Sequence, residues 1–192
     1  TLVSEFMLQQ TQVKTVIPYF NKFLKNIPNF NSLSKINEVK LLKYWQGLGY
    51  YSRAKNLKKS AKIIIDNYNG RLPNNFDELK KLPGVGDYTA SAISAIVFNE
   101  PIIPLDGNIE RVLKRILNLK TEEEIKKKNL HNKKKIFGKT LRSSDYAQAL
   151  MEIGAMVCKP KNPYCKKCPI TKNCLSFERK DFEIKKKNKK II

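Results

Sequence analysis

Residues 82–90, LPGVGDYTA, form the stretch of the sequence that decides the fold. Gly84, Val85 and Gly86 join two short helical patterns there. Glycine reaches positive φ values and lets backbone N–H groups approach a ligand, and the N-terminus of the following helix attracts an anion. A G-x-G pair is also compatible with a plain tight turn. Pro83 before it and the alanine-rich helix after it favour a helix-hairpin-helix that binds phosphate.

The rest of the sequence carries helical patterns. Apolar residues recur at intervals of three and four, and no run of useful length alternates as a half-buried strand would. We therefore predict an all-α protein. Helices are expected after Pro18 as far as residue 27, and over residues 38–46, 51–68, 76–82, 88–98, 109–119 and 144–158. Asn75 with Glu78 predicts a capping-box start for the fourth of these helices, and Asp87 a cap for the fifth.

Two prolines in NEPIIPLDGN, residues 99–108, interrupt the helical patterns and predict a domain boundary. We expect a first domain over residues 1–101, a second over 102–180, and a basic tail or linker over 181–192. The charged stretch 120–140, which contains the sole histidine, His131, is expected to be a surface loop or an exposed helix. The chain starts without a methionine inside a helical pattern, as a fragment would.

The charge of the chain predicts an anionic partner. The net charge is +21 over 192 residues, with a pI near 9.8, which favours nucleic acid. Only six of the 38 basic residues are arginine, and abundant lysine beside asparagine and isoleucine also reflects an AT-rich genome. No secretory signal and no apolar run of about 18 residues is present. We expect a monomer without a membrane partner, located in the cytoplasm and, in a bacterium, associated with the nucleoid.

All four cysteines lie in VCKPKNPYCKKCPITKNC, residues 157–174. Their spacing is C-x6-C-x2-C-x5-C, at Cys158, Cys165, Cys168 and Cys174. Two disulfides are disfavoured because no secretory signal is present, and zinc because only one C-x2-C pair exists. The uneven loops suit a [4Fe–4S] cluster, which is the interpretation that we favour over the other two.

The lysines between these cysteines suggest what such a centre is for. Five of them lie on loops that a cluster would hold in place: Lys159, Lys161, Lys166, Lys167 and Lys172. A fixed basic loop is suited to binding phosphate. We therefore expect the cluster to support a DNA-contacting loop. The alternative is a redox ferredoxin, a class that is usually acidic and has no need of the helices upstream.

The stretch PLDGNIERV, residues 104–112, places Asp106 just before a predicted helix. Taken alone, an aspartate there is an ordinary N-cap. Its position between a helix-hairpin-helix and the cysteine cluster resembles the endonuclease III superfamily of DNA glycosylases. The stretches SEFMLQQTQV (4–13), GLGYYSRAKNL (47–57) and LDGNIERV (105–112) resemble the MutY-type adenine DNA glycosylases in particular. The resemblance covers the chain to about Phe177.

The resemblance implies a fold and an activity. The fold would be a six-helix barrel with the helix-hairpin-helix, plus a helical iron–sulfur domain with a [4Fe–4S] cluster. The partner would be double-stranded DNA bound between these parts. The activity would be removal of adenine mispaired with 8-oxoguanine, or with guanine, in base excision repair. Alternatives are an endonuclease III-like pyrimidine glycosylase and lyase, a DNA-binding module that has lost catalysis, and an electron-transfer protein.

The resemblance also assigns catalytic roles. Glu5 would protonate N7 of adenine and then handle the water, and its apolar neighbours on a helix should raise its pKa. Asp106 would stabilise the sugar cation, with Asn108 as a polar partner. Tyr88 stands where the lyase relatives carry the lysine that forms a Schiff base, so we expect base removal without efficient strand cleavage. A plain exposed glutamate is the alternative for Glu5.

Further residues match DNA-contacting positions of the family. Gln10 would wedge into the base stack, Leu48 and Tyr50 would line the base opposite adenine, and Glu152 would reach the adenine pocket. Helix-end packing is the alternative for Leu48 and Tyr50, and a surface glutamate the alternative for Glu152. The chain departs from the family at Glu110, where some members have lysine, and at Ala147, where asparagine is common. After residue 180 it has only a lysine tail.

Overall fold

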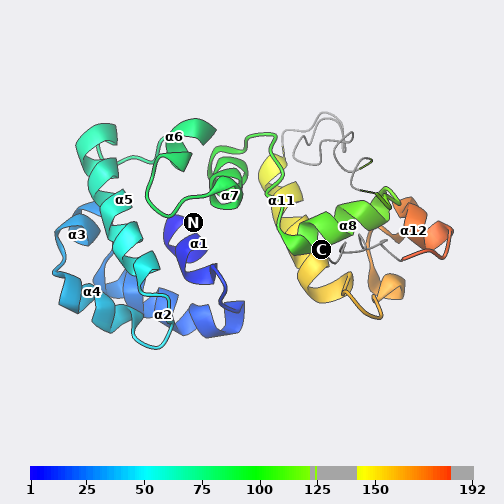
Figure 1. Ribbon diagram of the computed structural model, residues 1–192, viewed down its shortest axis with the longest axis horizontal. Coiled ribbons are helices and arrows are strands. Elements are labelled where there is room, and N and C mark those ends of the chain that lie inside the picture. Colours follow the sequence, from blue (N-terminus) through cyan, green and yellow to red (C-terminus); the bar gives the residue numbers. More distant parts are fainter. Residues whose placement is uncertain (122–123, 125–141, 183–192) are drawn as a thin grey trace, which may run out of the picture. The chain divides into compact units, whose positions relative to one another are not determined.

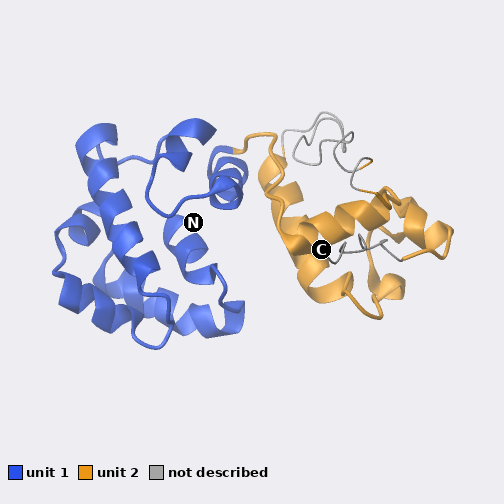
Figure 2. Ribbon diagram, in the orientation of Figure 1, with its two compact units in different colours: residues 1–98 blue, residues 99–192 orange. Residues whose placement is uncertain are grey.

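The computed structural model describes residues 1–121, 124 and 142–182. The chain divides into two compact units, Thr1–Phe98 and Asn99–Ile192 (Figure 2). Most of the charged stretch 120–140, with His131, and nearly all of the basic tail lie outside the described residues. The predicted domain limits 1–101, 102–180 and 181–192 stay a prediction.

Unit 1 is helical from end to end (Figure 1). Its helices are α1 (Leu2–Leu8), α2 (Val13–Asn26), α3 (Phe30–Lys35), α4 (Glu38–Trp45), α5 (Ser52–Tyr68), α6 (Phe76–Lys80) and α7 (Asp87–Phe98). The longest, α5, contacts α1, α3 and α4. The core forms around Trp45, whose ring meets Phe23 edge to face at 6.2 Å between centroids. Burial of these aromatic side chains stabilises the unit.

Unit 2 is also helical in its described residues. It contains α8 (Gly107–Ile116), α11 (Ser143–Glu152), a π-helical turn (Ile153–Val157), two 3₁₀ turns (Cys165–Lys167 and Thr171–Asn173) and α12 (Leu175–Glu178). Its core gathers apolar side chains of α8 and α11 with Ile103 and Leu119. The described residues of the whole chain contain no strand, and no described helix is long and apolar enough to cross a membrane.

Several helix limits differ from the prediction. Helix α2 begins at Val13 and continues through Pro18, although proline cannot donate the bond that Lys14 O would accept. The buried side chains of Val16 and Phe23 hold both halves of α2 against the core. The predicted helix 144–158 ends at Glu152, and a π-helical turn follows it. Helix α3 was not predicted, because its six residues are too few to show a period.

The predicted helix starts are partly correct. Asn75 Oδ1 accepts from the backbone N–H groups of Asp77 and Glu78, as an N-cap does. The Glu78 carboxylate does not close the capping box, because it accepts from Tyr68 Oη and pairs with Lys81. Helix α7 starts one residue earlier than predicted, at Asp87.

Candidate active site and nucleic-acid interface

Glu5 is a buried carboxyl group. It lies on the inner face of α1 with Leu2, Phe6 and Met7, and only 7% of its surface is exposed. In the described part of the chain its carboxyl oxygens have no hydrogen-bond or ion-pair partner. Burial raises its pKa from 4.5 to about 7, against a smaller opposite effect of the N-terminal amine. Glu5 is therefore close to half protonated at neutral pH.

The predicted DNA-contacting residues of unit 1 lie in two short turns. Gln10 follows α1 and is exposed, while Tyr50 precedes α5 and is 62% exposed. Both have backbones in the left-handed region, with φ of 55° and 45°. Leu48 differs, because it is buried in the core of unit 1. Its side chain packs inside the unit, and its predicted role beside the opposite base stays a prediction.

Arg53, a residue that the sequence did not single out, connects these two turns. Its Nη1 donates to the carbonyl oxygens of Phe6 and Met7, at 3.1 and 2.8 Å, and to that of Gln9. Its Nη2 donates to the carbonyls of Leu48 and Gly49, at 3.1 and 3.2 Å. The guanidinium is buried and lies 5.6 Å from the Trp45 ring centroid and 5.5 Å from that of Tyr50.

The hairpin after α6 uses its two glycines differently. Gly84 has φ +82°, and a Cβ there would meet Phe6 Cε1 at 2.8 Å. Gly86 has open space around its Cα, so the fold itself does not require a glycine there. Gln9 Nε2 donates to Gly84 O at 3.2 Å, which ties the end of α1 to the hairpin.

The residues between and after the two glycines of the hairpin differ in their exposure. Val85 is buried, while Gly86 is exposed at the start of α7. Tyr88 lies in the first turn of that helix and is half-buried. The exposed backbone at Gly86 therefore lies directly before the N-terminus of α7, and Tyr88 follows in the first turn of that helix.

In unit 2, Asp106 is the N-cap of α8. Its Oδ1 accepts from the backbone N–H of Ile109 at 2.7 Å, and its Oδ2 accepts from Asn108 Nδ2 at 3.3 Å. Arg111 continues this chain of contacts: its Nη2 donates to Asn108 Oδ1 at 2.9 Å and its Nε to Cys158 O at 2.8 Å. The predicted pair of Asp106 and Asn108 thus comes together, and hydrogen bonds link it to the first cysteine.

The π-helical turn packs against the same segment. A Cβ on Gly154 would meet Asn108 Cβ at 2.9 Å and the Asn108 carbonyl atoms at 3.2 Å. Gly154 O also accepts from Arg111 Nη2 at 2.8 Å. Glu152, at the end of α11, is exposed. The two departures from the family are accommodated locally: Glu110 pairs with Lys114 one turn on, and Ala147 is buried.

The four cysteines surround one small cavity. All four line it, together with Arg115, Phe177 and Phe182, and none of them forms a disulfide. Arg115 Nη1 lies 3.4 Å from Cys158 Sγ, and Cys174 Sγ lies 3.5 Å from Arg115 O. Burial, reinforced by the three other cysteines, raises the pKa of the Cys165 thiol. Among the described residues no three His, Cys, Asp or Glu side chains are grouped to hold a single metal ion.

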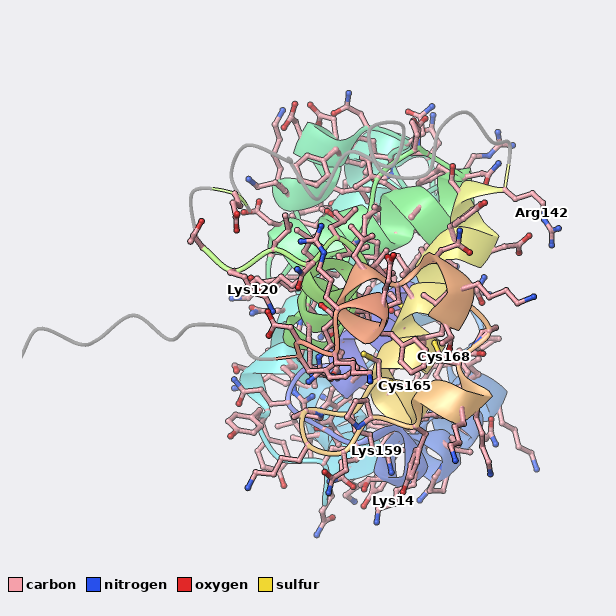
Figure 3. All side chains as sticks on the ribbon, turned by 90° about the vertical axis from the view of Figure 1, so that its right-hand side faces the viewer. Lys14, Lys120, Arg142, Lys159, Cys165 and Cys168 are labelled. Carbon is pink, nitrogen blue, oxygen red and sulfur yellow. The ribbon has the colours of Figure 1, made fainter. Side chains whose placement is uncertain are left out.

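Lysines cover the outside of the cysteine loops. Figure 3 shows Cys165 and Cys168 close together, with Lys159 on a loop of the same region. Lys161, Lys166, Lys167 and Lys172 are exposed, and residues 157–177 contain no acidic side chain. Arg115 holds the loop from inside, because it donates to Lys159 O at 2.7 Å and to Pro160 O at 2.9 Å.

The sequence matches a known protein family over most of its length. Residues 3–135 match the model described as HhH-GPD superfamily base excision DNA repair protein. The chain belongs to this superfamily. The helix-hairpin-helix at Gly84–Gly86 and the Asp106 segment both lie inside the matched residues. The predicted all-α class and the predicted family are thereby confirmed.

Individual relatives of this HhH-GPD chain are DNA glycosylases. The adenine DNA glycosylase of Buchnera aphidicola subsp. Baizongia pistaciae is 45% identical over 203 residues, covering 100% of this chain and 55% of that protein. That of Mus musculus is 37% identical over 180 residues, covering 92% and 35%. The structure of a thermostable thymine-DNA glycosylase superposes with a TM-score of 0.76 at 28% identity, covering 93% and 83%. The chain spans about half the length of the Buchnera relative.

The division of this HhH-GPD chain into units separates the predicted site residues. Unit 1 holds Glu5, the two turns around Gln10 and Tyr50, and the hairpin with Tyr88, while unit 2 holds Asp106, Asn108, Glu152 and the cysteines. The roles assigned to all these residues stay predictions. Sequence reasoning missed Gln9, Arg53, Arg111 and Arg115. For the three arginines the scarcity of arginine in a lysine-rich chain was a partial signal, because it leaves only six candidates for a planar, branched donor.

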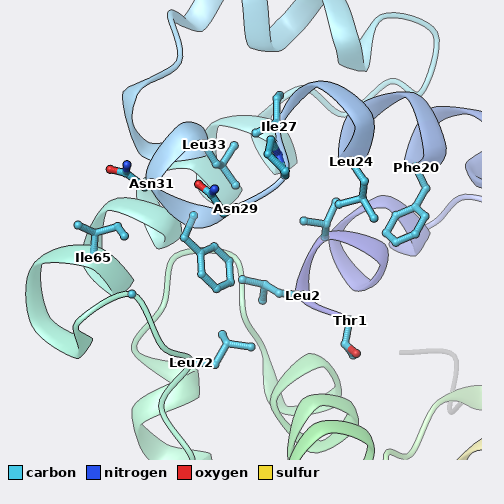
Figure 4. A pocket seen from close by; sticks show the side chains of 14 residues that line it. Thr1, Leu2, Phe20, Leu24, Ile27, Asn29, Asn31, Leu33, Ile65 and Leu72 are labelled. Carbon is cyan, nitrogen blue, oxygen red and sulfur yellow. The ribbon is translucent and has the colours of Figure 1, made fainter.

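A separate pocket of unit 1 contains none of the predicted site residues. Its volume is about 450 Å³, and side chains such as Leu2, Phe20, Leu24 and Leu72 line it (Figure 4). One of its polar side chains, Asn29, is engaged in capping α3 through Ser32 N. The pocket thus offers few polar groups to a ligand, and we assign it no role.

Proposed function

We propose that this protein is a monofunctional DNA glycosylase that removes adenine mispaired with 8-oxoguanine or guanine. The observation that carries the proposal is Glu5, a buried carboxyl group without a partner whose pKa is about 7. It lies in a chain of the base excision repair superfamily whose relatives include adenine DNA glycosylases. The proposed partner is double-stranded DNA, bound by a monomer.

The chemistry explains the need for such a carboxyl group. The target base must leave the stack and enter a pocket, and the departing purine must be protonated as the N-glycosidic bond breaks. A carboxyl group with a pKa near 7 is protonated often enough to act as that acid. Once it has given its proton to adenine N7, the Glu5 carboxylate is available to accept a proton from the attacking water.

A second carboxylate is needed beside the sugar. Loss of the base gives the sugar oxocarbenium character, which an ionised carboxylate stabilises. Asp106 is suited to this role because its two oxygens accept from Ile109 N and Asn108 Nδ2, which hold the carboxylate in one orientation. The N-cap and the proposed catalytic role are compatible, since each oxygen retains a lone pair for further contacts.

Strand cleavage is not part of the proposal. A lyase of this superfamily type needs an amine that forms an imine with the opened sugar. By the family resemblance, Tyr88, in the first turn of α7, stands where the lyases carry that amine, and its phenol cannot form an imine. An endonuclease III-like lyase therefore receives no support from this residue.

The four cysteines fit a [4Fe–4S] cluster, which we propose as the cofactor. Cys158, Cys165, Cys168 and Cys174 line one cavity as free thiols, and no acidic side chain competes with them there. Thiolates on a four-iron cluster stand farther apart than thiolates on one ion, because each binds a different iron. The bound cluster would cross-link the loops that carry the exposed lysines. Iron and sulfide analysis should find about four of each per chain.

The experiment that tests the proposed activity is the release of free adenine. The protein would be incubated in excess with duplexes containing 8-oxoguanine·A, G·A or T·A, and adenine would be quantified by chromatography. We expect release from the first two, and a loss of about 10³-fold or more in Glu5→Gln, because a positioned acid supplies a factor of that size. Glu38→Gln is the matched control, since Glu38 is an exposed glutamate of the same unit.

Other outcomes would replace the proposal. Release of a damaged pyrimidine in place of adenine would assign the chain to the endonuclease III-like class. Tight duplex binding without release of any base would identify a DNA-binding module without catalysis.

A further inference from the structure

We propose that Arg53 is a positioning residue that holds the turns of Gln10 and Tyr50 in one fixed arrangement for base extrusion. The inference deepens the proposed function, because it rests on these two turns contacting the DNA. Arg53 itself is buried and acts through the backbone of both turns.

The contacts of Arg53 join two segments far apart in the sequence. Its Nη1 binds the carbonyl groups that end α1, those of Phe6, Met7 and Gln9. Its Nη2 binds the carbonyl groups of the turn before α5, those of Leu48 and Gly49. One planar guanidinium thus fixes the distance and orientation between the two turns.

The backbone next to these contacts is strained. Gln9 O and Gly49 O accept from Arg53, and the residues that follow, Gln10 and Tyr50, have φ of 55° and 45°. Among the described residues, seven non-glycine residues have positive φ, and four of them are asparagine, the type that best tolerates it. Strain of this kind persists only where the surroundings enforce it, and it gathers at functional sites.

Only arginine can make this set of contacts. Its fork offers two nitrogens in one plane, whereas a lysine ammonium is a single point that reaches one group of carbonyls. No carboxylate pairs with Arg53 in the described part of the chain, so carbonyl dipoles and the Trp45 and Tyr50 rings compensate its charge. Burial lowers the pKa of the guanidinium, which shows that the position is costly for a cation.

The arrangement has a consequence for base extrusion. A nucleotide leaves the stack only if protein groups occupy its place, and loops that need no reordering make this cheaper. The side chains of Gln10 and Tyr50 are exposed on backbones that Arg53 holds in place. Loss of the fork should therefore slow base excision far more than it weakens duplex binding.

The test compares Arg53→Lys with Arg71→Lys, the same change at an exposed arginine. Single-turnover adenine excision should fall about 10- to 100-fold in Arg53→Lys, as expected of a displaced positioning group, and stay unchanged in Arg71→Lys. Affinity for an undamaged duplex, measured alongside, should change little. The unfolding midpoint should fall moderately because buried carbonyl groups lose their donor, so excision is compared at a temperature where both proteins are folded. Amide hydrogen exchange at Gln9, Thr11 and Leu48, which are hydrogen-bonded in the unaltered protein, should speed up together in Arg53→Lys.

A second measurement needs no variant. In the unaltered protein under mild urea, the amides of Gln9, Thr11 and Leu48 should open in one step, since one side chain holds both turns. Opening of the two turns at different urea concentrations would overturn the proposal, as would unchanged excision and exchange in Arg53→Lys. If the unaltered protein released no adenine, the proposed function would fail, while the exchange measurements would still decide the role of Arg53.

Discussion

Glu5 combines a functional advantage with a cost in stability. A carboxyl group that is 7% exposed and has no partner loses its hydration when the chain folds. The folded protein therefore holds the proton more tightly than the unfolded chain does, which the rise of the pKa to about 7 expresses. The same burial that keeps an acid available at neutral pH also makes the ionised form unfavourable.

This cost predicts a stabilising variant. Because the folded pKa of Glu5 is raised, its contribution to stability is complete below about pH 4.5 and is lost as pH rises through about 7. The loss at pH 8 amounts to about 3 kcal/mol. Glu5→Gln cannot ionise, so urea denaturation should find it more stable than the unaltered protein at pH 8, by ~1–3 kcal/mol, and similar to it at pH 4. A less stable Glu5→Gln at pH 8 would contradict the burial of an ionisable carboxyl group.

At the residue scale, buried and half-buried arginines connect separate backbone segments of this chain. Three of its six arginines, Arg53, Arg111 and Arg115, each bind several backbone carbonyl groups. The other three, at positions 71, 142 and 179, are exposed. Half of the arginines therefore occupy sites where one planar, branched donor binds several carbonyl groups at once.

At the scale of elements, the two glycines of the hairpin should respond differently to substitution, because only Gly84 lies in close contact with other atoms. Gly84→Ala places a Cβ 2.8 Å from Phe6 at positive φ, so it should lower the free energy of unfolding by about 1–3 kcal/mol. Gly86→Ala meets no atom within 4 Å and should leave stability unchanged to within about 0.5 kcal/mol. If the hairpin binds phosphate, fluorescence anisotropy should still find weaker duplex binding in Gly86→Ala. Equal stability losses in both variants would refute this division.

The contact between the π-helical turn and α8 is a second test at this scale. Gly154→Ala would press on Asn108, whose Cβ lies 2.9 Å from the added atom, and should cost about 1–3 kcal/mol despite the helix propensity of alanine. Gly107→Ala is the matched control, because nothing lies within 4 Å of its Cβ position. Urea denaturation measures both. A neutral Gly154→Ala would mean that the turn does not support the Asp106 segment.

The elements that could be predicted from the sequence are those whose structure depends on neighbouring residues. The hairpin, the Asn75 cap and α5 were predictable because each depends on residues close together in the chain. The course of α2 through Pro18 and the π-helical turn were not, since tertiary packing decides them. Arg53 and Arg111 were not predictable for the same reason, because each also binds carbonyl groups more than forty residues away. The Asp106–Asn108 pair was predictable because its members are neighbours.

At the scale of the whole molecule, the net charge of +21 predicts salt-dependent DNA binding. Removing one lysine that pairs with a phosphate should reduce the slope of log affinity against log salt by about 0.9. Replacing Lys161, Lys166, Lys167 and Lys172 by glutamine should flatten this slope, because all four are exposed and no acidic residue lies in the loop. Glutamine at the exposed Lys22, Lys25, Lys35 and Lys40 of unit 1 is the control. An equal change in both quadruple variants would mean that the cysteine loops make no special contact.

The most direct measurement is single-turnover cutting of a duplex with one 8-oxoguanine·A pair, followed with and without alkali. We predict cutting of the adenine strand only after alkali, at a rate that falls above pH 7 as Glu5 loses its proton. Glu5→Gln should abolish it. Cutting without alkali, or full cutting by Glu5→Gln, would contradict the account of a monofunctional glycosylase that uses Glu5 as its acid.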